Sequence, residues 1–317
     1  MSTVAADGTR LITGYVPKLG LTYAGIVCYG ILAVAFWARF FAHGRQKYML
    51  TLCIGTTTMA MGFGVRIKMT SQPDSLGVYV GTTLLTLLSP CAFLANDYII
   101  LPRLARWLDA EEQLFMPASR VVKTFVWSDV VTFLLQAAGG GMSAMQSEGS
   151  QKAGLYIALV GLVIQCVSFM LFISLASIWG YRVRRTSKWT SKPTNSQGFT
   201  VTLRRMEDWR IILYAVLWTG LGIMIRCIFR VIEYAEGFDG NLRTTEWAFY
   251  VLDALPLFLA ISVWAFVWPP TILKEHNEYF GANTRIDSMG SENATAQYPL
   301  TSRVSPGWTN YDGKQQA

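Results

Sequence analysis

The sequence has little charge for its length. Charged residues make up 15% of the 317 residues, whereas hydrophobic residues make up 52%. An average soluble domain has roughly 25% charged residues, so this deficit excludes an ordinary soluble fold. The net charge of +7 does not indicate a nucleic-acid partner. The basic residues stand at the ends of apolar runs, where they are typical of membrane orientation.

Histidine is nearly absent, and the cysteines are isolated from one another. His43 and His276 both lie outside the apolar runs, so neither a histidine-ligated zinc centre nor a Ser-His-Asp triad in the membrane is expected. The five cysteines have neither metal-ligand spacing nor the pattern of a disulfide framework. They are expected to behave as small buried hydrophobes.

The sequence also lacks the glycine-rich phosphate loop of nucleotide hydrolases, so ATP hydrolysis by this chain is not expected. With no nucleophile motif, metal cluster or nucleotide loop, an intramembrane enzyme is the least favoured class. We therefore predict no catalytic residues, no metal and no cofactor.

What the sequence does have is long apolar runs. Each has 20 or more mainly apolar residues, enough for a helix to cross about 30 Å of hydrocarbon. The runs are expected to form helices at 19–41, 47–67, 78–101, 122–144, 154–180, 210–232 and 245–268. This pattern predicts an all-α polytopic membrane protein, a bundle of seven transmembrane helices.

The two ends of the chain differ from the middle. Residues 1–17 are polar and lack the short apolar stretch of a cleavable signal peptide, so we predict an extracellular N-terminal segment. Residues 18–270 form the predicted membrane domain. Residues 271–317 have too little apolar surface to pack and are predicted to be a disordered tail.

Lysine and arginine set the expected orientation. Nineteen of them fall in the first, third and fifth connections and the tail, and six fall on the opposite side. Because cytoplasmic loops are enriched in basic residues, we predict that the N-terminus is outside and the C-terminus is cytoplasmic, with the plasma membrane as the expected location. The basic segment 181–210 is predicted to contact anionic lipid or a cytosolic protein.

Five ionisable side chains lie inside the predicted helices, where each needs a partner or a cavity. They are Asp97, Asp129, Arg226, Arg230 and Asp253.

The spacing of these groups predicts particular contacts. Arg226 and Asp253 should lie at the same depth on adjacent helices, so we predict an ion pair between them. Arg226, Arg230 and Glu233 are spaced to share one helix face, and that face should look into the bundle. Gln136 lies two turns along the helix from Asp129.

Two interpretations of these polar groups remain open. They could be structural pairs that lock the helices, or they could line a path for a substrate or a proton; signalling switches are a third alternative. Gly139, Gly140 and Gly141 are expected to allow close helix packing. Pro90 and Pro256 lie inside predicted helices and should kink them.

Four stretches together resemble the fungal RTA-like family, also called the lipid-translocating exporter family. The resemblance covers roughly residues 14 to 270. The stretches are Gly14-Tyr15-Val16-Pro17, Ser128-Asp129-Val130 through Gly141, Arg226 through Gly240, and Asp253-Ala254-Leu255-Pro256.

The resemblance implies a seven-helix membrane protein linked to lipid movement and to resistance against toxic amphiphiles, such as sphingoid long-chain bases and sterol-like compounds. The positions carried over as substrate-binding or pathway residues are Asp129, Gln136, Arg226, Arg230, Glu233 and Asp253. Asp97 lies in the segment Ala95-Asn96-Asp97-Tyr98, where many relatives are more apolar, so no role is carried over to it.

Two functions follow as hypotheses. The first is a transporter, exporter or flippase for lipids or amphiphilic toxicants, with membrane lipids or amphiphilic small molecules as partners. The alternative is a seven-helix receptor or a lipid or stress sensor.

Overall fold

A computed structural model of the chain describes residues 19–43, 45–71, 75–143, 145, 147–186, 209–237 and 246–273. The predictions for the N-terminal segment 1–17, for most of the basic segment 181–210 and for the tail after residue 273 lie outside these ranges.

The described residues form helices and turns, and seven helices are long and apolar enough to cross a membrane. The first six spans are α1 (Leu19–Ala42), α2 (Leu50–Ser71), α3 (Leu76–Trp107), α4 (Ala118–Ser143), α5 (Glu148–Arg184) and α7 (Trp209–Glu236). The seventh span, here called helix seven, covers Phe249–Leu273 and contains the π-helical η4 (Phe249–Ala254) and α10 (Leu255–Phe266), with the short α9 (Glu246–Ala248) just before it. Of the short 3₁₀ turns, η1 (Lys47–Met49) begins the second span and η2 (Glu111–Gln113) lies between the third and fourth spans. The predicted all-α fold is confirmed, and the chain is a multi-pass membrane protein.

Two helices extend well past their predicted ends. α3 has 32 residues and α5 has 37, because both continue through basic residues that follow the apolar run, such as Arg103 and Arg184. Hydropathy locates only the part of a helix that lies in hydrocarbon. Residues with long basic side chains can be part of the helix while their charged ends reach the interface. The helix therefore continues beyond the apolar run.

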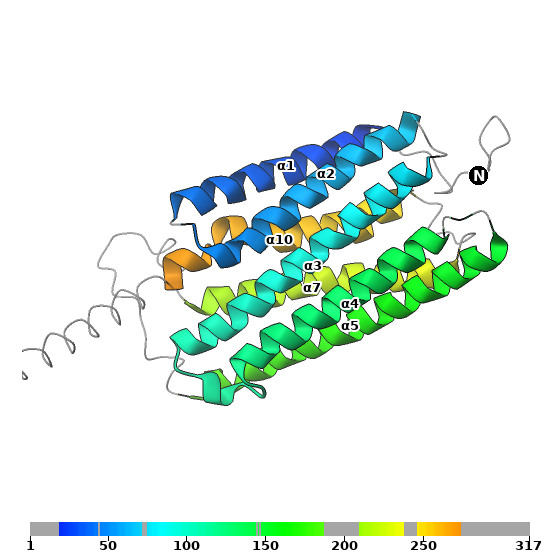
Figure 1. The fold of residues 1–317 in the computed structure, drawn as a ribbon. Helices are drawn as coiled ribbons and strands as arrows, with labels where there is room; N and C mark the ends of the chain where they lie inside the picture. The colour runs from blue at the N-terminus through cyan, green and yellow to red at the C-terminus, as the bar shows by residue number, and fades with distance from the viewer. Residues whose placement is uncertain are drawn as a thin grey trace, which may run out of the picture. The chain divides into compact units, whose positions relative to one another are not determined.

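The spans pack in a closed order around the bundle. Each of α1 to α5 contacts the next, α5 contacts α7, α7 contacts α10, and α10 returns to α1. α3 also contacts α7 across the middle, and Figure 1 shows these two helices side by side. The interior polar groups described below lie on α3, α4, α5, α7 and helix seven.

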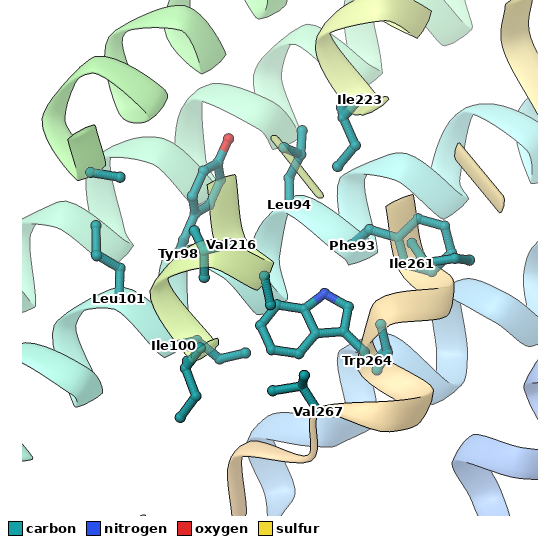
Figure 2. Packing of buried hydrophobic residues seen from close by; sticks show 14 of the residues in the cluster. Phe93, Leu94, Tyr98, Ile100, Leu101, Val216, Ile223, Ile261, Trp264 and Val267 are labelled. Carbon is teal, nitrogen blue, oxygen red and sulfur yellow. The ribbon is translucent and has the colours of Figure 1, made fainter. Parts of the chain in front are cut away.

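The core between α3, α7 and α10 is built from large apolar side chains. Trp264 of α10 is fully buried. Figure 2 shows its indole ring between Phe93 of α3 and Val216 of α7, close to Val267. Because lipid is as apolar as this core, shape-matched packing holds membrane helices together more than exclusion from water does.

Glycine allows the closest helix contacts. A Cβ atom on Gly139 of α4 would lie 2.5 Å from the Ala158 backbone nitrogen of α5. A Cβ atom on Gly222 of α7 would lie 2.5 Å from the Cβ of Ala260 in α10. The packing interpretation of the glycine run therefore holds for Gly139, whereas a Cβ on Gly140 or Gly141 would meet nothing within 4 Å.

The outer face of the helices is apolar and exposed. Val34, Leu171 and Phe266 expose 71%, 61% and 68% of their surface. Extended apolar surfaces of this kind mark an interaction site or a membrane. On seven helices of spanning length they form the lipid-facing surface.

Candidate functional site

A buried ion pair joins α7 to helix seven. Arg226 Nη1 lies 2.6 Å from Asp253 Oδ2, and the two side chains are 3% and 0% exposed. The predicted ion pair between these residues is confirmed. The contact satisfies the charge, but its angle falls outside hydrogen-bond geometry, since Nη1 has no hydrogen-bond partner among the described residues.

Arg230 closes the group by binding two carboxylates. Its Nε and Nη2 donate to Oδ1 and Oδ2 of Asp253 at 2.7 and 2.9 Å, and its Nη1 donates to Oε2 of Glu233 at 3.1 Å. A two-point arginine–carboxylate contact fixes geometry as well as charge. Arg226, Arg230, Glu233 and Asp253 are hereafter the paired cluster, which holds two positive and two negative charges.

A proline in α3 supplies the remaining partner of Arg226. Pro90 has no N–H, so the carbonyl of Thr86, four residues earlier, has no helical donor. Arg226 Nη2 donates to that carbonyl at 3.0 Å. The paired cluster therefore ties α3 to α7 and helix seven, and Pro90 makes the third anchor available.

Arg66 is a buried cation that the sequence interpretation counted with the basic residues of the outer side and not with the five ionisable groups inside the helices. It lies in α2 and is 6% exposed, with its guanidinium carbon 4.2 Å from the centroid of the Phe249 ring. Arg230 lies 5.5 Å from the same ring. Cation–ring contacts of this length are attractive, so Phe249 of η4 accommodates two guanidinium groups beside the paired cluster.

A second polar region, between α3 and α4, has no such compensation. It comprises Asn96, Asp97 and Tyr98 of α3 and Asp129 of α4, hereafter the unpaired cluster, and all four are at most 4% exposed. Both oxygens of each aspartate, the Tyr98 hydroxyl and the Asn96 amide atoms have no hydrogen-bond partner in the described part of the chain. Buried polar groups are normally satisfied, so these exceptions need an explanation.

The Tyr98 hydroxyl and the Asp129 carboxyl are close enough to interact electrostatically, but they do not meet hydrogen-bond geometry. Figure 2 shows the Tyr98 hydroxyl directed away from the Trp264 side of the core. The Tyr98 ring contacts Phe125 of α4 and Phe172 of α5, with centroids 5.4 and 4.6 Å apart. Asp129 follows Phe125 by one turn, so the two side chains share the face of α4 on which the three rings meet.

A layer of neutral polar groups lies further along the same interface. Gln136 of α4 donates from Nε2 to Oε1 of Gln165 in α5 at 2.6 Å. Gln165 in turn donates from Nε2 to Sγ of Cys91 in α3 at 3.6 Å. Sequence reasoning identified Gln136 but missed Gln165 and Cys91, since isolated Gln and Cys residues in apolar runs carry no sequence signal.

These groups form a series along α3. From the Thr86 carbonyl, which binds Arg226, the series continues about 8 Å to Cys91 and about a further 10 Å to Tyr98. Asp129 and Tyr98 lie about 15 Å from the adjoining ends of α4 and α3. Polar groups therefore occur at several depths through the interior of the bundle. The paired cluster, whose charges are compensated, lies at one end of this series, and the unpaired cluster lies at the other.

The chemistry that this series supports is binding and proton transfer. Among the described residues, no group of three or more His, Cys, Asp or Glu side chains is placed to hold a metal ion. All five cysteines are free thiols, and Cys28 is exposed on α1, contrary to the expectation that each is buried.

A separate apolar groove of about 190 Å³ follows the outer side of α7 and α10. It lies on helices that the paired cluster joins, but its lining offers only apolar contact. The lining residues are Trp218, Leu221, Gly222, Ile225, Leu255, Pro256, Leu259 and Ala260.

Known proteins are similar to this chain over most of its length. A family model described as "RTA1 like protein" matches residues 52–276. Protein RTA1 of Saccharomyces cerevisiae is 30% identical over 314 residues, covering 91% of this chain and 94% of that protein.

Two further relatives from the same yeast have names that describe transport. Protoporphyrin uptake protein 1 is 30% identical over 215 residues, covering 65% of this chain and 64% of that protein. The sphingoid long-chain base transporter RSB1 is 25% identical over 280 residues, covering 81% of this chain and 72% of that protein. No solved structure was found to match the chain.

Proposed function

This chain belongs to the RTA1-like family of membrane proteins, and on that premise we propose that it is a transporter that moves amphiphilic molecules across a membrane. The proposed substrates are lipids or amphiphilic toxicants, including long-chain bases and sterol-like compounds. Their removal would contribute to stress or drug resistance, and the proposed location is the plasma membrane.

The observation that carries this proposal is the uncompensated polar series inside the bundle. Asp129 and Tyr98 are buried without a hydrogen-bond partner among the described residues, and Gln136 continues the series towards α5. A fixed membrane anchor gains nothing from unsatisfied polar groups in its interior, because each one destabilises the fold. A transport path needs such groups, because they replace water around the polar head of a passing substrate.

The six predicted site positions have two roles in this proposal. We assign Asp129 and Gln136 to the path itself. Arg226, Arg230, Glu233 and Asp253 are paired with one another, so we assign them to holding α7 against helix seven beside the path.

The groove on α7 and α10 supports an amphiphilic substrate or a bound lipid. Its lining is apolar and open to the side of the bundle, which suits an acyl chain or a ring system. With no nucleotide-binding loop in the sequence, the proposed movement runs downhill or is coupled to an ion gradient.

Reconstitution tests the transporter proposal. The purified full chain is placed in phosphatidylcholine vesicles that carry a fluorescent long-chain base in the outer leaflet, and dithionite quenching follows the movement of the label between leaflets. We expect movement at least tenfold faster than in empty vesicles. Movement at the empty-vesicle rate, for both this probe and a fluorescent phospholipid, would contradict the proposal.

One observation favours the alternative function of a lipid or stress sensor. The Tyr98, Phe125 and Phe172 rings contact one another on the face of α4 that carries Asp129, and aromatic faces of this kind bind cationic groups. A sensor would bind the long-chain base without moving it, so saturable binding together with unaccelerated leaflet exchange would identify it.

A further inference from the structure

We propose that Asp129, with Tyr98, Phe125 and Phe172, forms a binding site for an alkylammonium head group, at which the ammonium and a proton compete for the same carboxylate. This inference rests on the proposed function and deepens it, because it locates the head-group site and names the ion exchanged. It also separates this site from the paired cluster, which holds most of the buried charge.

The first argument is the missing counter-charge. The Asp129 side chain is 4% exposed, and neither of its oxygens has a partner among the described residues. An isolated carboxylate in a medium of low dielectric is expensive to maintain. The group therefore binds a proton when the site is empty, and it can release that proton only if another cation replaces it.

The second argument is that Asp129 forms no ion pair with a described cation. From α3, the titratable groups coupled electrostatically to Asp129 are the Tyr98 hydroxyl and the Cys91 thiol, and Tyr98 is also coupled to Asp97. From α7 there is the Cys227 thiol, and from α5 the amide of Gln165 lies in the adjoining layer. No lysine or arginine among the described residues pairs with Asp129, so the site accepts a cation from outside the protein.

The third argument is the aromatic surroundings. Phe125 and Phe172 lie with their ring centroids 5.5 Å apart, and each contacts the Tyr98 ring. Aromatic faces attract ammonium and quaternary ammonium groups. A carboxylate that shares a helix face with Phe125 and interacts with Tyr98 is suited to an alkylammonium and offers little to a phosphate or a carboxylate.

The fourth argument is that the other buried carboxylates are already occupied. Asp253 contacts both Arg226 and Arg230, and Glu233 contacts Arg230. An incoming ammonium would have to displace a guanidinium held at two points, whereas at Asp129 it displaces only a proton. The head group therefore binds at Asp129.

The exchange step conserves charge at the site. The ammonium enters with its own protons, the O–H bond of the Asp129 carboxyl breaks, and one proton passes to water. The carboxylate then pairs with the ammonium. When the amphiphile leaves, one proton returns to the carboxyl, so each cycle exchanges one cationic head for one proton.

A permanently charged probe tests the exchange because the probe itself cannot release a proton. Octadecyltrimethylammonium carries no ionisable proton, so any proton that it releases comes from the protein. The purified full chain in lightly buffered detergent is titrated with the probe while a pH indicator records release. We expect up to one proton per probe bound, and a tenfold loss of affinity for each unit of falling pH while the carboxyl is protonated.

Variants assign the effect to Asp129. Asp129→Asn should bind the probe weakly, with no proton release and no pH dependence, whereas Asp129→Glu should restore both. Asp97→Asn is the matched control, because Asp97 is equally buried and unpartnered but is not placed in the site. It should release protons as the wild type does. Phe125→Leu should weaken binding about threefold to tenfold through loss of one ring face.

The outcomes separate this inference from the transporter proposal. Binding with no proton release and no pH dependence in the wild type would overturn the inference, even if leaflet movement were fast. Loss of release in Asp97→Asn but not in Asp129→Asn would also overturn it. Proton release without accelerated leaflet movement would support the site and reject the transporter proposal, leaving the sensor.

Discussion

The two buried polar regions of the bundle contain similar residues but differ in how their charges are satisfied. In the paired cluster, Asp253 lies within 2.7 Å of two guanidinium groups. In the unpaired cluster, Asp129 and Asp97 have no partner in the described part of the chain. Both regions lie inside membrane-spanning helices, so the contrast is one of pairing and not of location.

This difference indicates that one polar region stabilises the bundle and the other serves its function. A buried pair is hard to break, because the partner left behind is an uncompensated charge. An unpaired carboxyl contributes no such bond, and its protonation can change without breaking one. We therefore infer that the paired cluster fixes the positions of α3, α7 and helix seven, while Asp129 of the unpaired cluster responds to cations.

The largest expected effect comes from breaking the paired cluster. Asp253→Asn leaves Arg226 and Arg230 with Glu233 alone, so one positive charge is uncompensated. We expect about 3–5 kcal/mol of lost stability, measured by denaturation of the purified protein in detergent. Adding Arg226→Gln restores neutrality, so the double variant should be more stable than Asp253→Asn alone; equal or lower stability would contradict the pairing account.

A smaller effect is expected where α7 packs against α10. The Cβ of Gly222→Ala would lie 2.7 Å from the Pro256 carbonyl oxygen, so the helices must separate. We expect a loss of about 1–3 kcal/mol in the same denaturation measurement. Gly141→Ala is the control, because its Cβ would meet nothing within 4 Å, and its stability should be unchanged or slightly higher.

The smallest stability effect is expected between the two clusters. Gln136→Leu removes the donor to Gln165 Oε1 and should cost about 1 kcal/mol, because a buried acceptor is left unsatisfied. Adding Gln165→Leu removes that acceptor as well and should recover most of the loss. If the double variant loses as much as the sum of the two single variants, the two glutamines do not interact.

The sequence predicted the paired cluster better than the unpaired one. Arg226 and Asp253 were predicted to pair because opposite charges at equal depth on adjacent helices have few other partners. Arg230 was predicted only to share a helix face with Arg226 and Glu233, so its two-point contact with Asp253 was not predicted. The Thr86 carbonyl could not be predicted as a partner, because a proline in a sequence does not reveal which side chain will bind the carbonyl that it frees.

The unpaired cluster was only partly visible in the sequence. Asp97 and Asp129 were identified as ionisable groups in apolar runs, but their lack of partners depends on how α3 and α4 face each other. Tyr98 reads as an ordinary aromatic residue, and its ring contacts with Phe125 and Phe172 join three helices. Hydropathy reports how apolar a helix is but not which of its faces meet.

The most direct test of the division between the clusters compares leaflet movement of the long-chain base in two folded variants. The Arg226→Gln/Asp253→Asn double variant keeps Asp129, and we predict movement within about threefold of wild type. Asp129→Asn should retain wild-type stability to within about 1 kcal/mol, since it replaces an unpartnered group by one of similar shape, yet move the probe at the empty-vesicle rate. The reverse result, with movement lost in the double variant and retained in Asp129→Asn, would contradict the account.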